Sequence, residues 1–295
     1  MRNDGRYPPP GLGRKLLIVL QINAYALWLK IINLRSRRPV VGGGDVDVSI
    51  TSYGDRVGRV YRTLETIGRG TTLPRNLVLW LEDEDQVANP PRTLRRLKKR
   101  GLTIRHCDGY GPHTKYFPYV MAEQLDRPLV TADDDVLYPT EWLAGLLAAY
   151  RPQQVSAYRT RVMNDGPYIT WSPCTSTAPS ENLLALGVSG VIYPPAVLIA
   201  LRERGDAFAA VCPHADDFWL HYATVASGLM VRQITETPAR WWPVQPLVAS
   251  TAWWRLRPKQ RGLWIQNQLS GGNDEISAAA ADAWLTPKTG EQSLS

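Results

Sequence analysis

The most informative segment of the sequence is Leu129-Val-Thr-Ala-Asp-Asp-Asp-Val-Leu-Tyr-Pro139. It opens with a short apolar run, which predicts a buried β-strand. Three carboxylates, Asp133, Asp134 and Asp135, then follow without a break. Adjacent negative charges repel one another unless a cation or a basic ligand lies close, so we expect a buried strand that presents an acidic tip to a ligand. Taken alone, the tip also fits a solvated turn or an N-cap for the helix expected from Thr140.

Outward from this stretch, predicted strands and helices alternate along the chain. Strands are expected at 46–50, 76–81, 102–106 and 128–131, and helices at 57–67, 92–100, 116–125 and 140–150. This alternation favours an α/β fold, in which a mostly parallel sheet carries helices on both faces. Such sheets bind ligands at the carboxyl ends of their strands, which is where the acidic tip falls.

The acidic tip has the chemistry of a divalent-cation site. Asp133 and Asp135 point to the same side of an extended strand end, and paired hard oxygens suit Mg²⁺ or Mn²⁺. Such ions keep open positions for phosphate oxygens, so a nucleoside diphosphate is a natural further ligand. The ion would act as a Lewis acid and neutralise charge on a departing diphosphate.

A second pair of carboxylates, Asp216 and Asp217, opens an apolar and aromatic helix. A carboxylate with a raised pKa can take a proton from an attacking hydroxyl group, so either residue could act as a general base. The alternative is structural, because an acid at a helix start caps free N–H groups and offsets the helix dipole.

Five segments with characteristic sequences occur in order between residues 46 and 235. They are 48–53 with Arg56, 77–81, 131–139, 187–195 and 212–219. Together they resemble bacterial glycosyltransferases of the GT-A fold that assemble surface polysaccharides, a family 2-like group of nucleotide-diphospho-sugar transferases. The resemblance implies that Asp133 and Asp135 form the metal and diphosphate motif, with Asp134 near the donor ribose.

The same resemblance assigns further site residues. The loop after the first strand, Thr51, Ser52 and Tyr53 with Arg56, is expected to contact the nucleotide. Lys115 matches a basic position that pairs with phosphate oxygens, although a lone lysine on a helix is also consistent with simple solvation. The pair Asp216-Asp217 falls where the family's catalytic base lies, and Asp217 is the expected base.

The expected activity is therefore a metal-dependent glycosyltransferase, a hexosyltransferase that moves one sugar from a nucleotide donor, with a UDP-sugar favoured. The acceptor class is a glycan or a lipid-linked glycan. Two other classes remain open: a metal-dependent nucleotidyltransferase or phosphohydrolase, and a catalytically silent sugar-binding protein of the same fold. Processive synthesis is not expected, because the chain has Gln260-Arg-Gly-Leu-Trp264 where processive synthases carry Gln-x-x-Arg-Trp.

The basic residues are concentrated at the N-terminus. Residues 1–44 hold eight Lys/Arg and one acid, which accounts for the whole net charge of +7 and leaves the remainder neutral. A nucleic-acid partner is therefore not expected. The apolar stretch 16–34, which Asn23, Lys30 and Asn33 interrupt, predicts an amphipathic helix on an anionic membrane surface. The alternatives are a helix packed on the domain and a membrane span.

The sequence divides into two units at a glycine tract, Gly42-Gly43-Gly44, which predicts a flexible boundary. The units are 1–44, a basic membrane-associating segment, and 45–295, the transferase domain. Three distant cysteines, Cys107, Cys174 and Cys212, indicate a reducing compartment. We therefore expect a cytoplasmic protein, peripheral at the inner face of the cell membrane.

The C-terminal part of the domain is rich in tryptophan and arginine. Five tryptophans fall between residues 241 and 264, interleaved with basic side chains. Aromatic faces stack on sugar rings, and basic residues on a closing loop can contact a diphosphate. Core packing, binding of single-stranded nucleic acid and anchoring at a bilayer are the alternative interpretations.

Overall fold

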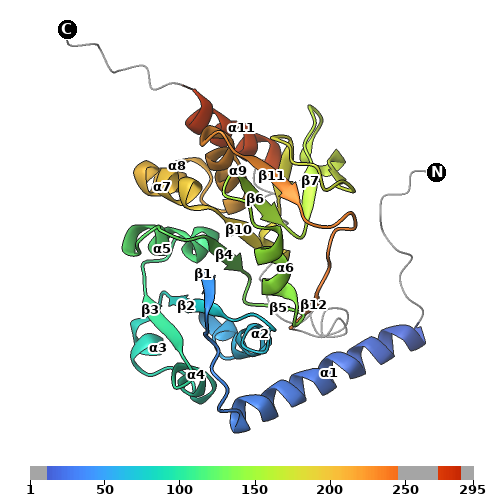
Figure 1. Cartoon of the computed structure of the whole chain (residues 1–295), viewed down its shortest axis with the longest axis vertical. Helices are drawn as coiled ribbons and strands as arrows, with labels where there is room; N and C mark the ends of the chain where they lie inside the picture. The colour runs from blue at the N-terminus through green and yellow to red at the C-terminus, as the bar shows by residue number, and fades with distance from the viewer. Residues whose placement is uncertain (1–11, 245–271, 287–295) are drawn as a thin grey trace.

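The computed structural model describes residues 12–244 and 272–286. Its centre is a seven-stranded, mostly parallel sheet with the order β11-β6-β10-β4-β1-β2-β3. The strands are β1 (Gly44–Thr51), β2 (Pro74–Leu81), β3 (Leu102–His106), β4 (Leu129–Ala132), β6 (Gln154–Ala157), β10 (Val191–Tyr193) and β11 (Met230–Gln233). Within this sheet β10 alone runs antiparallel to its neighbours, β4 and β6. The predicted α/β fold is confirmed (Figure 1).

Helices cover both faces of the sheet because successive side chains of each strand point to opposite sides. Leu129 of β4 packs into one buried cluster and its neighbour Val130 into the other. The first cluster is completed by α5 (Phe117–Ala122), α7 (Pro195–Arg204), α8 (Phe208–Val211), α9 (Asp216–Ala226) and α11 (Gly272–Leu285). The second is completed by α2 (Tyr61–Ile67), α4 (Arg92–Lys98) and α6 (Trp142–Ala149). A further short helix, α3 (Glu84–Ala88), follows β2.

Two details differ from the prediction. The helix expected over 57–67 is regular only from Tyr61, because the chain first makes a 3-10 turn, η1 (Gly54–Arg56), in which Gly54 has φ +51°. The antiparallel direction of β10 was not expected. The strand follows η4 (Gly187–Ser189), and Gly190 between them has φ +94°. A Cβ on Gly190 would lie 2.5 Å from Nε1 of Trp142, so this reversal requires glycine.

Three short strands and a two-stranded ribbon complete the described part beyond β6. Strands β7 (Thr160–Val162), β8 (Ser172–Pro173) and β9 (Leu183–Ala185) form a small antiparallel sheet. Strand β12 (Trp242–Pro243) pairs with β5 (Val136–Leu137), which directly follows the acidic tip. This ribbon ties the segment after β11 to the edge of the sheet that carries the site.

The N-terminal helix α1 (Leu12–Arg35) packs on the domain through one face (Figure 1). Ile22, Ala26 and Leu29 are buried. Asn33, expected on a polar face, is also buried: its Nδ2 donates to Glu65 Oε1 (2.8 Å) and to the Thr93 carbonyl (3.0 Å). A buried amide needs hydrogen-bond partners, and Glu65 provides one. Asn33 therefore faces the protein and not the solvent.

The opposite face of α1 is apolar and exposed. It carries Leu17, Leu20, Leu27, Trp28, Ile31 and Leu34, each at least 36% exposed. Of the helices in the two described ranges, none is long and apolar enough to cross a bilayer. After α1, the glycine tract is held by backbone hydrogen bonds: the Gly42 N–H donates to the Pro74 carbonyl (2.7 Å), and Gly44 already belongs to β1. The division into units at residue 44 stays a prediction.

Candidate active site

The acidic tip lies at the carboxyl edge of the sheet, where β4 and its neighbour β1 both end. Two side chains of the core fix the tip's backbone. The Asp133 N–H donates to the Tyr138 hydroxyl (3.0 Å), and the Thr63 hydroxyl donates to the Asp134 carbonyl (2.9 Å). Three carboxylates are thus held at defined positions beside the loop that follows β1.

That loop supplies partners for two of the three carboxylates. The Arg56 guanidinium pairs with Asp134 and contacts Asp135 Oδ2 at 2.9 Å. The Ser52 hydroxyl donates to Asp134 Oδ2 (2.6 Å). Burial raises the pKa of Asp134, whereas Arg56 and Ser52 act to lower it. Burial also raises the pKa of Asp135 to about 6, opposed by Arg56 and reinforced by Asp133 and Asp134.

Lys115 links the tip to the second pair of carboxylates. It lies at the end of η2 (Gly111–Lys115), and its Nζ contacts Asp133 Oδ1 at 2.9 Å and Asp216 Oδ2 at 3.1 Å. Burial alone would lower the pKa of Lys115, but Asp133, Asp216 and Asp217 raise it well above its usual value. A simply solvated lysine is therefore excluded, because the ammonium is buried among three carboxylates.

Asp217 accepts a hydrogen bond from the backbone of η4. Its Oδ1 receives the Gly187 N–H at 3.0 Å. Burial, followed by the charge of Asp216, raises the pKa of Asp217 to about 8. Burial also raises the pKa of Asp216. Neither carboxylate caps α9, because its N-cap residue is Ala215 and no side-chain cap hydrogen bond forms there. Both acids lie in the first turn of the helix, where they still offset its dipole.

Gly187 allows the backbone to approach this cluster closely. A Cβ at this position would lie 3.1 Å from Lys115 Nζ and 3.2 Å from Asp217 Oδ1. A side chain here would therefore push the ammonium and the carboxylate away from the backbone N–H.

Only part of the loop after β1, which was expected to contact the nucleotide, points toward the acid cluster. Ser52 and Arg56 join the acid cluster, but the Thr51 hydroxyl donates to the Trp80 carbonyl (3.3 Å) and so points toward the neighbouring strand. Tyr53 is 43% exposed and lies beneath the Arg56 guanidinium, 5.4 Å from the ring centroid. A hollow of ≈160 Å³ opens beside this loop, lined by Ser52, Tyr53, Gly54, Glu82, Asp83 and Gln86. No sequence pattern marks Glu82, Asp83 and Gln86 as residues of this hollow.

The expected metal ligands were tested against this geometry. Within residues 12–244 and 272–286, no three Asp, Glu, His or Cys side chains converge as a ready-made metal site. Mg²⁺ in phosphate-transfer sites is commonly held by one or two carboxylates, with water and substrate phosphates completing its ligands. Asp133 and Asp135 fit that arrangement, because both are partly exposed carboxylates in a cluster of like charge.

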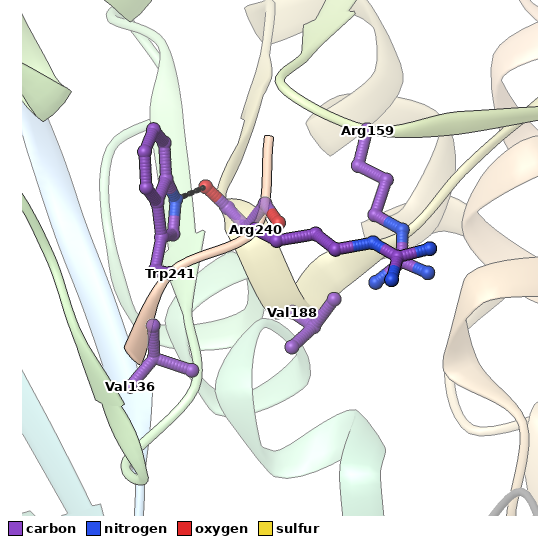
Figure 2. A pocket seen from close by; sticks show the side chains of 6 residues that line it. Val136, Arg159, Val188, Arg240 and Trp241 are labelled. Atoms are coloured by element: carbon purple, nitrogen blue, oxygen red, sulfur yellow. Dashed lines mark hydrogen bonds between the residues drawn. The ribbon is translucent and has the colours of Figure 1, made fainter. Parts of the chain in front are cut away.

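Figure 2 shows the side chains that line a larger cavity, of ≈250 Å³. The lining residues are Val136, Arg159, Val188, Ser189, Arg240 and Trp241. Val136 directly follows the acidic tip, and Val188 directly follows Gly187. Arg159 could not be recognised as a site residue from the sequence, because an isolated arginine in an irregular segment has no local pattern.

Part of the tryptophan-rich segment can be placed. Trp241 Nε1 donates to the Ser189 carbonyl (3.3 Å), and its ring packs edge-on against Tyr158. Trp242 lies in β12 and is 44% exposed. Trp253, Trp254, Trp264 and the Gln260–Trp264 stretch lie outside the described residues.

Comparisons with known proteins give a structural likeness only. No protein-family model matches the sequence, and no curated protein sequence matches it. Similar solved structures include the mannosyltransferase PcManGT from Pyrobaculum calidifontis in complex with GDP-mannose and Mn²⁺, which is 13% identical with a TM-score of 0.46, over 90% of this chain and 85% of that one. TarS from S. aureus is 14% identical with a TM-score of 0.45, over 82% of this chain and 71% of that one.

A third similar structure is 4-diphosphocytidyl-2C-methyl-D-erythritol synthase from Anaerococcus prevotii. It is 15% identical with a TM-score of 0.38, over 54% of this chain and 74% of that one. At this level of identity and TM-score we argue function from the side chains of the site itself.

Proposed function

We propose that the protein is a metal-dependent glycosyltransferase that moves one sugar from a nucleoside-diphosphate donor to a glycan or lipid-linked acceptor. A UDP-sugar is the first donor to test. The observation that carries the proposal is the convergence of Asp133, Lys115 and Asp217 at one edge of the sheet. These three supply a ligand for a metal–diphosphate complex, a buried cation beside it, and a carboxylate of raised pKa.

The donor would lie along the loop after β1 and the acidic tip. Asp133 and Asp135 would hold Mn²⁺ or Mg²⁺, which supplies Lewis-acid stabilisation of the leaving diphosphate when bound. Lys115 and Arg56, now paired with the carboxylates, are the cations available to the phosphate oxygens. Ser52 positions Asp134 by its hydrogen bond, so that this carboxylate stays ordered beside the donor ribose.

Asp217 would act as the base on the acceptor side. The Gly187 N–H fixes Oδ1, and we assign proton acceptance to Oδ2. As the acceptor oxygen bonds to the anomeric carbon, its proton passes to Asp217 and the bond to the diphosphate breaks. A direct displacement of this kind inverts the configuration of the sugar. The raised pKa of Asp217 strengthens it as a proton acceptor.

The proposal is tested by incubating the purified protein with Mn²⁺ and a panel of nucleotide sugars, with and without a membrane extract as the source of acceptor. Phosphorus NMR identifies the product. A glycosyltransferase releases the nucleoside diphosphate, and the release increases with acceptor. Release of a nucleoside monophosphate or pyrophosphate would instead indicate a phosphohydrolase or nucleotidyltransferase. Metal-dependent nucleotide binding without any product would indicate the silent sugar-binding protein.

We also propose that the exposed apolar face of α1 rests on an anionic membrane. This face has the length and composition of an interfacial helix, with Trp28 stacked on Tyr25 at 5.2 Å. Exposed basic residues border it: Lys30, Arg35 and Arg37. Apolar side chains would enter the headgroup region while these cations contact anionic lipid.

Replacing Leu27 and Ile31 together by Glu should reduce binding to phosphatidylglycerol-containing vesicles by more than about tenfold, because burying each side chain contributes ~1.5–3 kcal/mol. Co-sedimentation of the full chain measures this. The matched control is the pair Ile169→Glu and Ile199→Glu, which changes two exposed apolar residues elsewhere. Equal binding by the α1 variant and this control would show that another surface binds the lipid.

A further inference from the structure

The ≈250 Å³ cavity is lined by residues that directly follow both halves of the proposed site in the sequence. One wall, Val136, is the residue after Asp135, on the metal side. Another wall, Val188, is the residue after Gly187, whose N–H binds Asp217. The cavity therefore lies where an acceptor hydroxyl would have to come to reach Asp217.

Two arginines extend into this cavity from separate segments. Arg159 lies between β6 and β7, and Arg240 lies between β11 and β12. Figure 2 shows their guanidinium groups side by side. Arg159 is half-buried and Arg240 is exposed. Burial, then the charge of Arg240, lowers the pKa of Arg159, so the two cations repel each other.

In the described ranges the two guanidinium groups make neither a hydrogen bond nor an ion pair. The charge of Asp217 opposes the lowering of the Arg159 pKa but does not reverse it. The arginines nearby are different. Arg56 is paired with Asp134, and Arg161 donates to the Tyr168 and Trp171 carbonyls. Two adjacent guanidiniums that lack an acidic partner form an electropositive cavity, which an anion would stabilise.

We propose that Arg159 and Arg240 bind a phosphate group of the acceptor and so position its hydroxyl at Asp217. This inference rests on the proposed function. Guanidinium groups present paired N–H donors that match phosphate oxygens. Lys115 and Arg56, which contact the acidic tip, are already available as cations for the phosphates of the donor. The Trp241 ring in the same cavity offers an apolar face to a sugar.

The segment that carries Arg240 also leads to α1, the helix that we propose to lie on the membrane. Trp242 and Pro243 follow the cavity residues directly and pair with β5. Val244 and Leu137 then pack with Leu29 of α1. An acceptor whose phosphate is carried by a lipid would therefore approach this cavity from the side on which α1 lies. A lipid-linked phosphate is the source that we favour over a soluble one.

The first test measures thermal stabilisation of the full chain by inorganic phosphate and methyl phosphate in EDTA, against acetate and NaCl at equal ionic strength. Arg159→Gln and Arg240→Gln should each weaken phosphate binding about tenfold, as expected for one charge-assisted hydrogen bond. The matched control is Arg75→Gln. Arg75 is exposed and lies at the N-terminal end of β2, away from the carboxyl edge of the sheet, so this variant should bind phosphate as the wild type does. Equal stabilisation by acetate, or unchanged binding in both variants, would overturn the proposal.

A second measurement separates this site from the donor site. The same variants are titrated with Mn²⁺ and nucleoside diphosphate, and we expect the wild-type response. Loss of that response would assign the arginines to the donor and overturn the proposal. If the wild type responds to phosphate through these arginines but to no nucleotide, the proposed glycosyltransferase function fails while the anion site stands. Vesicles carrying a polyprenyl phosphate should compete with methyl phosphate, and failure to compete would overturn the lipid source.

Discussion

Asp217→Asn should lower the rate of sugar transfer by about 10²–10⁴-fold, the usual contribution of a general base. The substitution keeps the size of the side chain but removes its capacity to take a proton. Single-turnover release of nucleoside diphosphate in the presence of acceptor measures the effect. Donor binding should be unchanged, because Asp217 contacts Gly187 on the acceptor side of Lys115. Asp216→Asn is the comparison: it should keep the proton acceptor but move the rise in rate to lower pH, because the charge of Asp216 helps to raise the pKa of Asp217.

The pH profile gives this prediction a second readout. The base works in its ionised form, and burial with the charge of Asp216 raises its pKa to about 8. The value of kcat/KM should therefore rise with pH up to about 8, whereas an unperturbed aspartate, with a pKa of about 3.9, would give a flat profile there. Asp217→Asn should abolish the slope. A variant that keeps both rate and slope would exclude Asp217 as the base.

Raising the pH should lower the stability of the folded protein, whereas it should increase the activity. Because the folded state holds the Asp217 proton more tightly than the unfolded chain does, stability falls as the pH rises from the unfolded pKa, about 4, toward the folded one. Asp217→Asn should therefore raise the melting temperature at alkaline pH. A residue with a purely structural role would lower it instead.

Nucleoside diphosphate with Mn²⁺ should raise the melting temperature by roughly 5–10 °C at a hundredfold excess over Kd, because such binding contributes ~2.7 kcal/mol. Chelation with EDTA should remove most of this shift, and Asp135→Ala should do the same. The ligand-free variant should not melt earlier than the wild type, since the pKa of Asp135 is already raised by burial and by its acidic neighbours.

Asp165→Ala, which removes an exposed acid from a distant loop, is the control for this experiment and should keep the full shift. A shift that survives both EDTA and Asp135→Ala would contradict the metal role of the acidic tip. The identity of the nucleotide that gives the largest shift would name the base of the donor.

The core of the fold could be predicted because the strands that form it are short apolar runs bounded by glycine, proline or charge. The direction of β10 could not, since it depends on the left-handed backbone of Gly190 and on the indole of Trp142 packed against it. The acidic tip and Asp217 were found because consecutive carboxylates are rare in a buried setting. Their connection through Lys115 depends on three segments far apart in sequence, and no local pattern reports it.

Both faces of α1 are rich in apolar residues, so the sequence could not distinguish the face that packs on the domain from the face left exposed. The choice depends on Asn33, which hydrogen-bonds the buried Glu65, and Glu65 in turn pairs with Arg100 at 2.7 Å. Arg159 was missed for a related reason, and Arg240 was expected only as one of the basic residues of the tryptophan-rich segment. They come from different segments, and only the folded chain brings them together.

The packing of α1 has a geometric consequence for an enzyme at a bilayer. Asn33 joins the helix to Glu65 and Thr93 by direct hydrogen bonds, and Ile22 and Leu29 are fully buried. A helix held in this way does not swivel as a tether would. If α1 binds the membrane as proposed, the site edge of the sheet would stay at a constant height above the lipid. Only an acceptor whose terminal sugar reaches that height would then be used.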